Sequence, residues 1–173
     1  MPGGHQEQHS SELGAAAPVD RELVLEVSRE LVASLAPEEM PLFRPVSTAF
    51  FADPRRLSSE SRDDMLGFGP GEAVTLITPV VISVVVEVIG LVRSELARDA
   101  SRQVAQGVED VVRRLFRKPG EGHAPQPAAP ELTREQLARV RSVAFEKARQ
   151  GGLGERRAQL LADATVGSLV LSP

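Results

Sequence analysis

Apolar positions are concentrated in one run, residues 74–92 (VTLITPVVISVVVEVIGLV), in which Glu87 is the only charged residue. Drawn as an α-helix, this run would be about 28 Å long, close to the roughly 30 Å thickness of a bilayer's hydrocarbon core. Its length and composition therefore favour a membrane-inserting helix, because most amphipathic helices of soluble proteins contain no apolar run of this length.

Two other interpretations of residues 74–92 stay open. A helix of this composition also fits the buried centre of a bundle or an oligomer, and its many β-branched residues are typical of one or two buried strands. No turn residue interrupts residues 80–89, which argues for a helix over strands. The residues expected to contact lipid or a neighbouring subunit are Val80, Val84, Glu87, Val88 and Leu91.

Polar and small residues inside the run recur at helical spacing. Ser83, Glu87, Gly90 and Ser94 would share one narrow face of a helix. A buried carboxylate without a partner is strongly unfavourable, so we expect Glu87 to face a partner, a water-filled pore or the exposed edge of a bundle. Thr78 is expected to cap this helix, with Pro79 in its first turn.

The segment before the run predicts further helices and therefore an all-α fold. Asp20 is a good N-cap for a helix whose apolar residues recur every three or four positions, and Pro37 is expected to end it. Residues 37–73 mix Pro with Phe and other apolar residues, which predicts a packed irregular region with short helices near 47–52 and 59–66.

The segment after the run carries a different pattern. No strong stop signal occurs between residue 92 and Lys118, so the central helix is expected to continue to about Phe116, with a coiled-coil-like seam of Val104, Val108, Val111 and Leu115 in its second half. Four basic residues end it. Arg113, Arg114, Arg117 and Lys118 are candidates for contact with anionic lipid headgroups, or they simply complement the helix dipole.

The C-terminal part predicts a separate helical hairpin. Residues 119–130 (PGEGHAPQPAAP) have the composition of a linker, so we divide the chain into a disordered tail (1–18), a main unit (19–118), this linker and a hairpin (131–173). Thr133 and Gln136 form a capping box, and Gly151 and Gly152 end the first helix. The residues expected to form a docking face for a partner, or else to complete the core of the bundle, are Leu137, Val140, Ala144, Leu161 and Leu169.

The composition argues against catalysis and metal binding. The chain has no Cys, Trp or Tyr and three His, which removes most nucleophile–base pairs and any thiolate metal site. We therefore expect no enzymatic activity, no cofactor and no metal site; the acids at 60–64 and the pair His5 and His9 are interpreted as solvated. A net charge of −4 argues against nucleic acid as a partner. Because the N-terminus lacks the pattern of a secretory signal, we expect the chain in the cytoplasm or on the cytoplasmic face of the membrane.

Two hypotheses follow. The first is a non-enzymatic, membrane-associating helical protein that self-assembles through residues 74–92, as a membrane anchor or a membrane-perturbing effector, and recruits an unidentified protein through its C-terminal hairpin. The second is an oligomeric scaffold or adaptor in which residues 74–92 form a buried interface between copies of the chain. Both predict a homo-oligomer; only the first requires membrane lipid as a partner.

Overall fold

The computed structural model describes residues 20–53, 76–99, 108–116 and 132–170. Within these ranges the chain is entirely helical and contains no strand, which confirms the predicted all-α class. The elements are α1 (Arg21–Leu35), the short 3₁₀-helix η1 (Pro37–Glu39), α2 (Met40–Ala52), α4 (Thr78–Asp99), α5 (Val108–Phe116), α6 (Arg134–Gln150) and α7 (Glu155–Val170).

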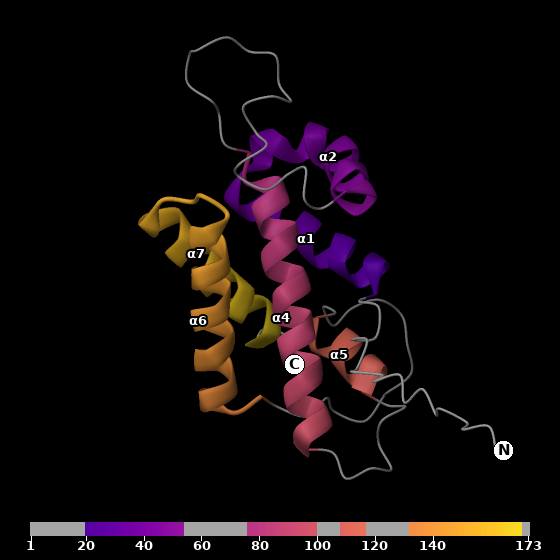
Figure 1. The fold of residues 1–173 in the computed structure, drawn as a ribbon, viewed down its shortest axis with the longest axis vertical. Helices are drawn as coiled ribbons and strands as arrows, with labels where there is room; N and C mark the ends of the chain where they lie inside the picture. The colour runs from indigo at the N-terminus through magenta and orange to yellow at the C-terminus, as the bar shows by residue number, and fades with distance from the viewer. Residues whose placement is uncertain (1–19, 54–75, 100–107, 117–131, 171–173) are drawn as a thin grey trace, which may run out of the picture.

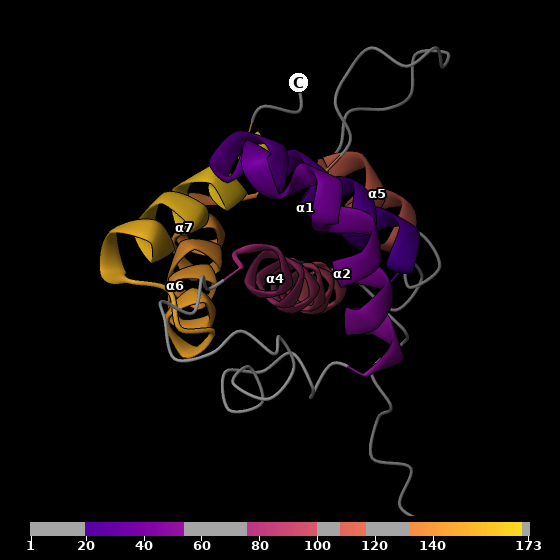
Figure 2. The ribbon, with the colours of Figure 1, turned by 90° about the horizontal axis from the view of Figure 1, so that it is seen from above.

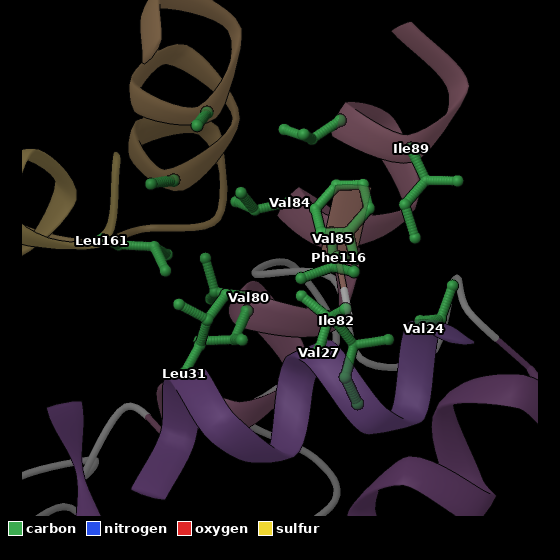
Figure 3. Packing of buried hydrophobic residues seen from close by; sticks show 14 of the residues in the cluster. Val24, Val27, Leu31, Val80, Ile82, Val84, Val85, Ile89, Phe116 and Leu161 are labelled. Atoms are coloured by element: carbon green, nitrogen blue, oxygen red, sulfur yellow. The ribbon is translucent and has the colours of Figure 1, made fainter. Parts of the chain in front are cut away.

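Helix α4 forms the centre of the fold. It packs against α1, α2, α5 and α6, while α7 packs on α6 and α1, so the α6–α7 hairpin lies along one flank of α4 (Figure 1). Figure 2 shows α4 end-on, with α1, α2, α6 and α7 around it. Each α-helix of the described ranges contributes side chains to one buried apolar cluster, part of which is drawn in Figure 3. The apolar side chains of residues 77–92 therefore pack largely against the chain's own helices.

Helix α1 forms as the sequence predicted. The Asp20 carboxylate accepts hydrogen bonds from the backbone N–H groups of Glu22 (3.0 Å) and Leu23 (3.3 Å), which caps the helix. Its apolar stripe is buried against α4 and its charged residues point outward. The burial of this stripe stabilises a helix of 15 residues, which would be marginal alone in water.

The region after α1 is more regular than predicted. A single helix, α2, runs from Met40 to Ala52, where the sequence indicated an irregular segment with a short helix from residue 47. Pro41 lies in the first turn, where its missing N–H has no intrahelical partner to lose. Pro45 does remove one hydrogen bond, but it lies on the exposed side of the helix, where water can solvate the carbonyl left over. The short helix predicted at 59–66 lies outside the described residues.

The prediction of one helix continuing to Phe116 is wrong. Helix α4 ends at Asp99, and α5 is a separate helix that packs back against α4, α1 and α7. A straight continuation would carry Arg113 about 20 Å beyond Asp99, whereas its guanidinium donates a hydrogen bond to Asp20 at the start of α1. The apolar face of α5 is thus buried within the chain through Val108, Val112, Leu115 and Phe116. Val104, predicted in a coiled-coil seam, lies outside the described residues.

A buried carboxylate caps the N-terminus of α4. Glu39, only 8% exposed, accepts hydrogen bonds from the backbone N–H groups of Ile77 (2.7 Å) and Thr78 (2.9 Å) and from the Thr78 hydroxyl (2.7 Å). These bonds satisfy donors that the first turn of a helix leaves unpaired, and the negative charge complements the helix dipole. The expectation that Thr78 caps α4 is therefore wrong: Thr78 is its first residue, and the cap comes from η1.

The predicted capping box and glycine turn of the C-terminal hairpin are both present in the structure. The Thr133 hydroxyl accepts from the Gln136 N–H (3.2 Å), and the Gln136 side chain accepts from the Thr133 N–H (2.8 Å), as in a capping box. The turn between α6 and α7 contains Gly152 at φ 86°, a left-handed conformation that favours glycine. Its neighbour Gly151 lies directly against Val80 of α4, so the turn covers the N-terminal end of that helix.

Two glycine-to-alanine substitutions are expected to change stability in opposite directions. A Cβ on Gly151 would lie 2.7 Å from Cγ1 of Val80, a stiff and buried side chain, so Gly151→Ala should lower the free energy of unfolding by about 1–3 kcal/mol. A Cβ on Gly90, in the middle of α4, meets no atom within 4 Å. Gly90→Ala should therefore raise the free energy of unfolding by about 0.5–1 kcal/mol through helix propensity. Urea unfolding of both variants tests this close contact, and a tolerated Gly151→Ala would contradict it.

Candidate interaction surface

The five residues predicted on the membrane or oligomer face of residues 74–92 do not share one environment. Val80, Val84 and Val88 are buried among the chain's own helices, and Leu91 is half-buried. Glu87 is exposed, with its carboxylate 3.6 Å from the ammonium of Lys147 on α6. The three valines are thus unavailable to lipid or to a second copy in this conformation.

The predicted polar stripe exists and forms the open side of α4. Glu87 and Ser94 are exposed, and Ser83 and Gly90 are half-buried. The hydroxyls of Ser83 and Ser94 donate to carbonyls of their own helix, those of Pro79 (3.0 Å) and Leu91 (2.8 Å). Of the environments considered for Glu87, the exposed edge of a bundle is the one that this geometry fits. No helix in the described part of the chain is long and apolar enough to cross a membrane.

Ion pairs follow the exposed edge of the seam between α4 and α6. Glu87 pairs with Lys147, and Glu95 accepts from Arg139 at 2.7 Å. Glu95, with a side chain only 12% exposed, also accepts from Arg98 at 3.0 Å. Glu87 and Glu95 lie about two turns apart on α4, and their partners Lys147 and Arg139 lie about two turns apart on α6 in the opposite chain direction. The two pairs therefore show that α4 and α6 are antiparallel. The Glu87–Lys147 pair is open to solvent and contributes little stability, so the apolar seam beneath the pairs is the main contact between the two helices.

The basic residues proposed to face lipid are partly engaged elsewhere. Arg113 pairs with Asp20, which ties α5 to the start of α1. Arg114 is half-buried, while Arg117 and Lys118 lie outside the described residues. Of the described basic residues, Arg113 therefore serves a contact within the chain.

The contact between Arg113 and Asp20 predicts an acid-dependent stability. Burial of the Asp20 carboxyl alone would raise its pKa, but the hydrogen bond from Arg113 and those from the N–H groups of Leu23 and Glu22 lower the pKa below its ordinary value of 3.8. A carboxyl whose pKa is lower in the folded state stabilises the fold above that ordinary value, and this contribution is lost as the pH falls through the folded-state pKa.

Asp20→Asn tests this dependence, because asparagine keeps the helix cap but carries no charge. The wild-type chain should have the higher free energy of unfolding at neutral pH, and the difference should shrink as the pH falls below 3.8. Urea unfolding of both proteins at a series of pH values measures the difference. A gap that stays constant over the series would show that the Asp20 charge does not contribute.

The residues predicted to form a docking face on the hairpin are largely buried in the core. Val140, Ala144, Leu161 and Leu169 are buried, and Leu137 is half-buried against the same cluster. They pack where α6 meets α4 and where α7 meets α1. Of the two roles considered from the sequence, the geometry fits completion of the bundle core.

A surface that the sequence did not indicate lies on the outer side of the same hairpin. A groove of about 390 Å³ runs between α6 and α7, lined by Ala138, Arg141, Ser142, Phe145, Glu155, Gln159 and Ala162. Phe145 is half-buried, and three of the other lining residues are small. The sequence signal was present in the spacing of Ala138, Ser142 and Phe145 along one face, but the stronger apolar stripe of α6 points the other way.

No candidate metal-binding group comes together in the parts of the chain that the structure describes. There, no three His, Cys, Asp or Glu side chains are close enough to hold a metal ion. The three His and the acids at 60–64 lie outside those parts. We take the hairpin groove as the candidate functional site, because its lining residues from α6 and α7 leave a hollow on the surface of the hairpin.

Comparison with known protein families, with curated proteins and with solved structures finds no match.

Proposed function

We propose that the chain is a non-enzymatic oligomeric scaffold or adaptor, which acts by binding polypeptides through its helical surface. The observation that carries this proposal is the burial of α4: Val80, Val84 and Val88, on the most apolar helix, are covered by α1, α6 and the other helices of the same chain. The apolar run that suggested a membrane helix already has a packing partner. Of the two hypotheses from the sequence, this supports the second, with one change: the buried apolar side chains of residues 80–92 pack within each copy, so we expect the copies to meet elsewhere.

The hairpin groove gives the scaffold a place to bind a helix. A third helix packs readily into the crease between two antiparallel helices, with an aromatic residue as an anchor and small residues that allow close approach. Phe145 supplies the anchor, and Ala138 and Ser142 supply the small residues. A helix of another polypeptide, including another copy of this chain, is the kind of partner that such a groove accepts.

Flotation combined with a mass measurement tests the proposal. The full chain is purified without detergent and mixed with vesicles of phosphatidylcholine and phosphatidylglycerol, then floated and washed with alkaline carbonate. The expected result is that the protein stays below the vesicles and has the mass of a defined oligomer by light scattering. Protein that floats and resists the wash would contradict the proposal and support membrane insertion. Neutral phosphatidylcholine vesicles, run in parallel, separate surface attraction of the basic residues from insertion.

A photo-crosslinking residue locates the binding surface. Incorporated at Ser142 in the groove, it should yield a covalent product with a polypeptide in cells that express the chain, and the same residue at Ser34 should not. Ser34 is the matched control because it is also an exposed serine but lies on α1. Equal products from both positions, or none from Ser142, would contradict the assignment of the groove.

A further inference from the structure

The outer groove of the hairpin is lined by one charged residue from each helix, and the two charges are opposite. Arg141 lines it on the α6 side and Glu155 on the α7 side. Asp163 lies further along α7, about two helical turns from Glu155. The Arg141 guanidinium donates to the Asp163 carboxylate across the groove at 2.5 Å. Both side chains of this pair are about half exposed, at 49% and 50%, so each keeps free hydrogen-bonding capacity toward the solvent. Phe145, which is half-buried and packs against the core cluster, also lines the groove.

This arrangement is complementary to itself. If a second hairpin is turned over about a two-fold axis along the groove, its α7 lies over α6 of the first copy and its α6 lies over α7. The Arg141 side of each copy then meets the Glu155 side of the other, and the two Phe145 side chains approach the axis. In such an isologous contact one favourable arrangement of charges is used twice.

We propose that the occupant of the groove is a second copy of this chain, and that two α6–α7 hairpins pair through their outer faces into a four-helix bundle. This inference rests on the proposed scaffold function and says where its copies meet. It also replaces the interface expected from the sequence, because the apolar side chains of that segment, such as Val80, Val84 and Val88, are buried within each copy.

The size of the face sets the strength of this dimer. Helices of 17 and 16 residues are about 25 Å long and each about 10 Å wide. The hairpin face therefore offers about 500 Å² per copy, or about 1,000 Å² in total, the lower limit for a specific interface. A reversible dimer with a dissociation constant in the micromolar range is expected, and not a permanent one.

Two groove variants and one control test the dimer in the full-length chain. Ala138→Glu places an acid on the Arg141 side of the groove at an exposed position, where it should not disturb the fold. Phe145→Glu removes the anchor. The control is Leu42→Glu, a side chain 47% exposed on α2, far from the hairpin in the chain and on another helix. Circular dichroism and urea unfolding establish that each variant is folded; Ala138→Glu keeps the test valid if Phe145→Glu is destabilised.

Sedimentation velocity over a concentration series supplies the answer. The wild-type chain should dimerise at micromolar concentrations, Ala138→Glu and Phe145→Glu should raise the dissociation constant by about tenfold or more, and Leu42→Glu should leave it unchanged. A wild-type chain that stays monomeric up to about 200 µM would overturn the inference. An oligomer that persists unchanged in both groove variants would overturn the hairpin dimer but would leave the scaffold proposal standing. Flotation of the protein with vesicles would instead contradict the scaffold proposal itself.

Discussion

Val84→Arg is expected to abolish the cooperative folded state of the chain. Val84 is 0% exposed and lies on α4 in the middle of the apolar cluster (Figure 3). An arginine there would have to bury its charge without a partner or push the surrounding helices apart, at a cost of several kcal/mol. That is a large part of the 5–15 kcal/mol by which domains are typically stable. Thermal unfolding followed by circular dichroism should show no sigmoidal transition.

Glu87→Arg provides the matched control, because it places the same side chain on the same helix less than one turn away. The Glu87 side chain is 52% exposed, and its pairing with Lys147 at 3.6 Å is open to solvent. Losing an exposed pair of this kind should change the free energy of unfolding by less than about 1 kcal/mol. If Val84→Arg unfolds with the same midpoint as Glu87→Arg, α4 is not packed as the structure places it.

Glu39→Ala is expected to produce the second largest loss, about 3 kcal/mol or more, since up to three buried donors lose their acceptor together. The donors are the N–H groups of Ile77 and Thr78 and the Thr78 hydroxyl. An alanine cannot replace these bonds, and the first turn of α4 has little access to water at this point because Ile77 and Thr78 are buried. Urea unfolding at neutral pH measures the change.

Two milder variants separate the parts of this cap. Glu39→Gln keeps one acceptor oxygen but loses the charge that complements the dipole of α4, so it should cost less than Glu39→Ala. Thr78→Val removes only the hydroxyl donor and should cost about 1 kcal/mol. Equal effects of Glu39→Ala and Glu39→Gln would show that charge, and not hydrogen bonding, dominates; a loss below about 0.5 kcal/mol in Glu39→Ala would contradict the cap.

The elements that the sequence predicted correctly are those with local causes. Asp20 caps α1 through N–H groups two and three residues away, and the capping box joins Thr133 to Gln136 three residues on. In each case the donor and the acceptor lie within one helical turn of each other, so both can be recognised in a short stretch of sequence. The same holds for the end of α6, where Gly152 adopts the left-handed conformation.

The elements that the sequence missed depend on distant partners. Glu39 is separated from Thr78 by 39 positions, and nothing near either residue indicates the other. Likewise, α5 packs back against α4, α1 and α7, where its apolar face is buried. The local sequence of α5 is equally compatible with a helix that continues α4. The character of residues 74–92 was ambiguous for a related reason: an apolar surface is equally satisfied by lipid or by other helices, and only the fold shows which helices cover it.

The candidate site illustrates the same limit. The sequence identified the apolar stripe of α6 and α7 and suggested a partner for it, but α4 and α1 cover that stripe in the structure. The groove lies on the opposite side of the hairpin, where Phe145 stands among small and charged residues. A weakly apolar surface between two helices exists only once both helices are in place.

Hydrogen–deuterium exchange of the purified full chain tests most directly whether α4 is the core of the chain's own bundle. Peptides from residues 80–92 should exchange among the slowest of the whole protein, without lipid and at concentrations below the dissociation constant of the dimer, because opening them requires near-global unfolding. The claim that α4 is this core would be contradicted if these peptides exchanged as fast as peptides from α1. It would also be contradicted if they became protected only when vesicles or high protein concentrations were added.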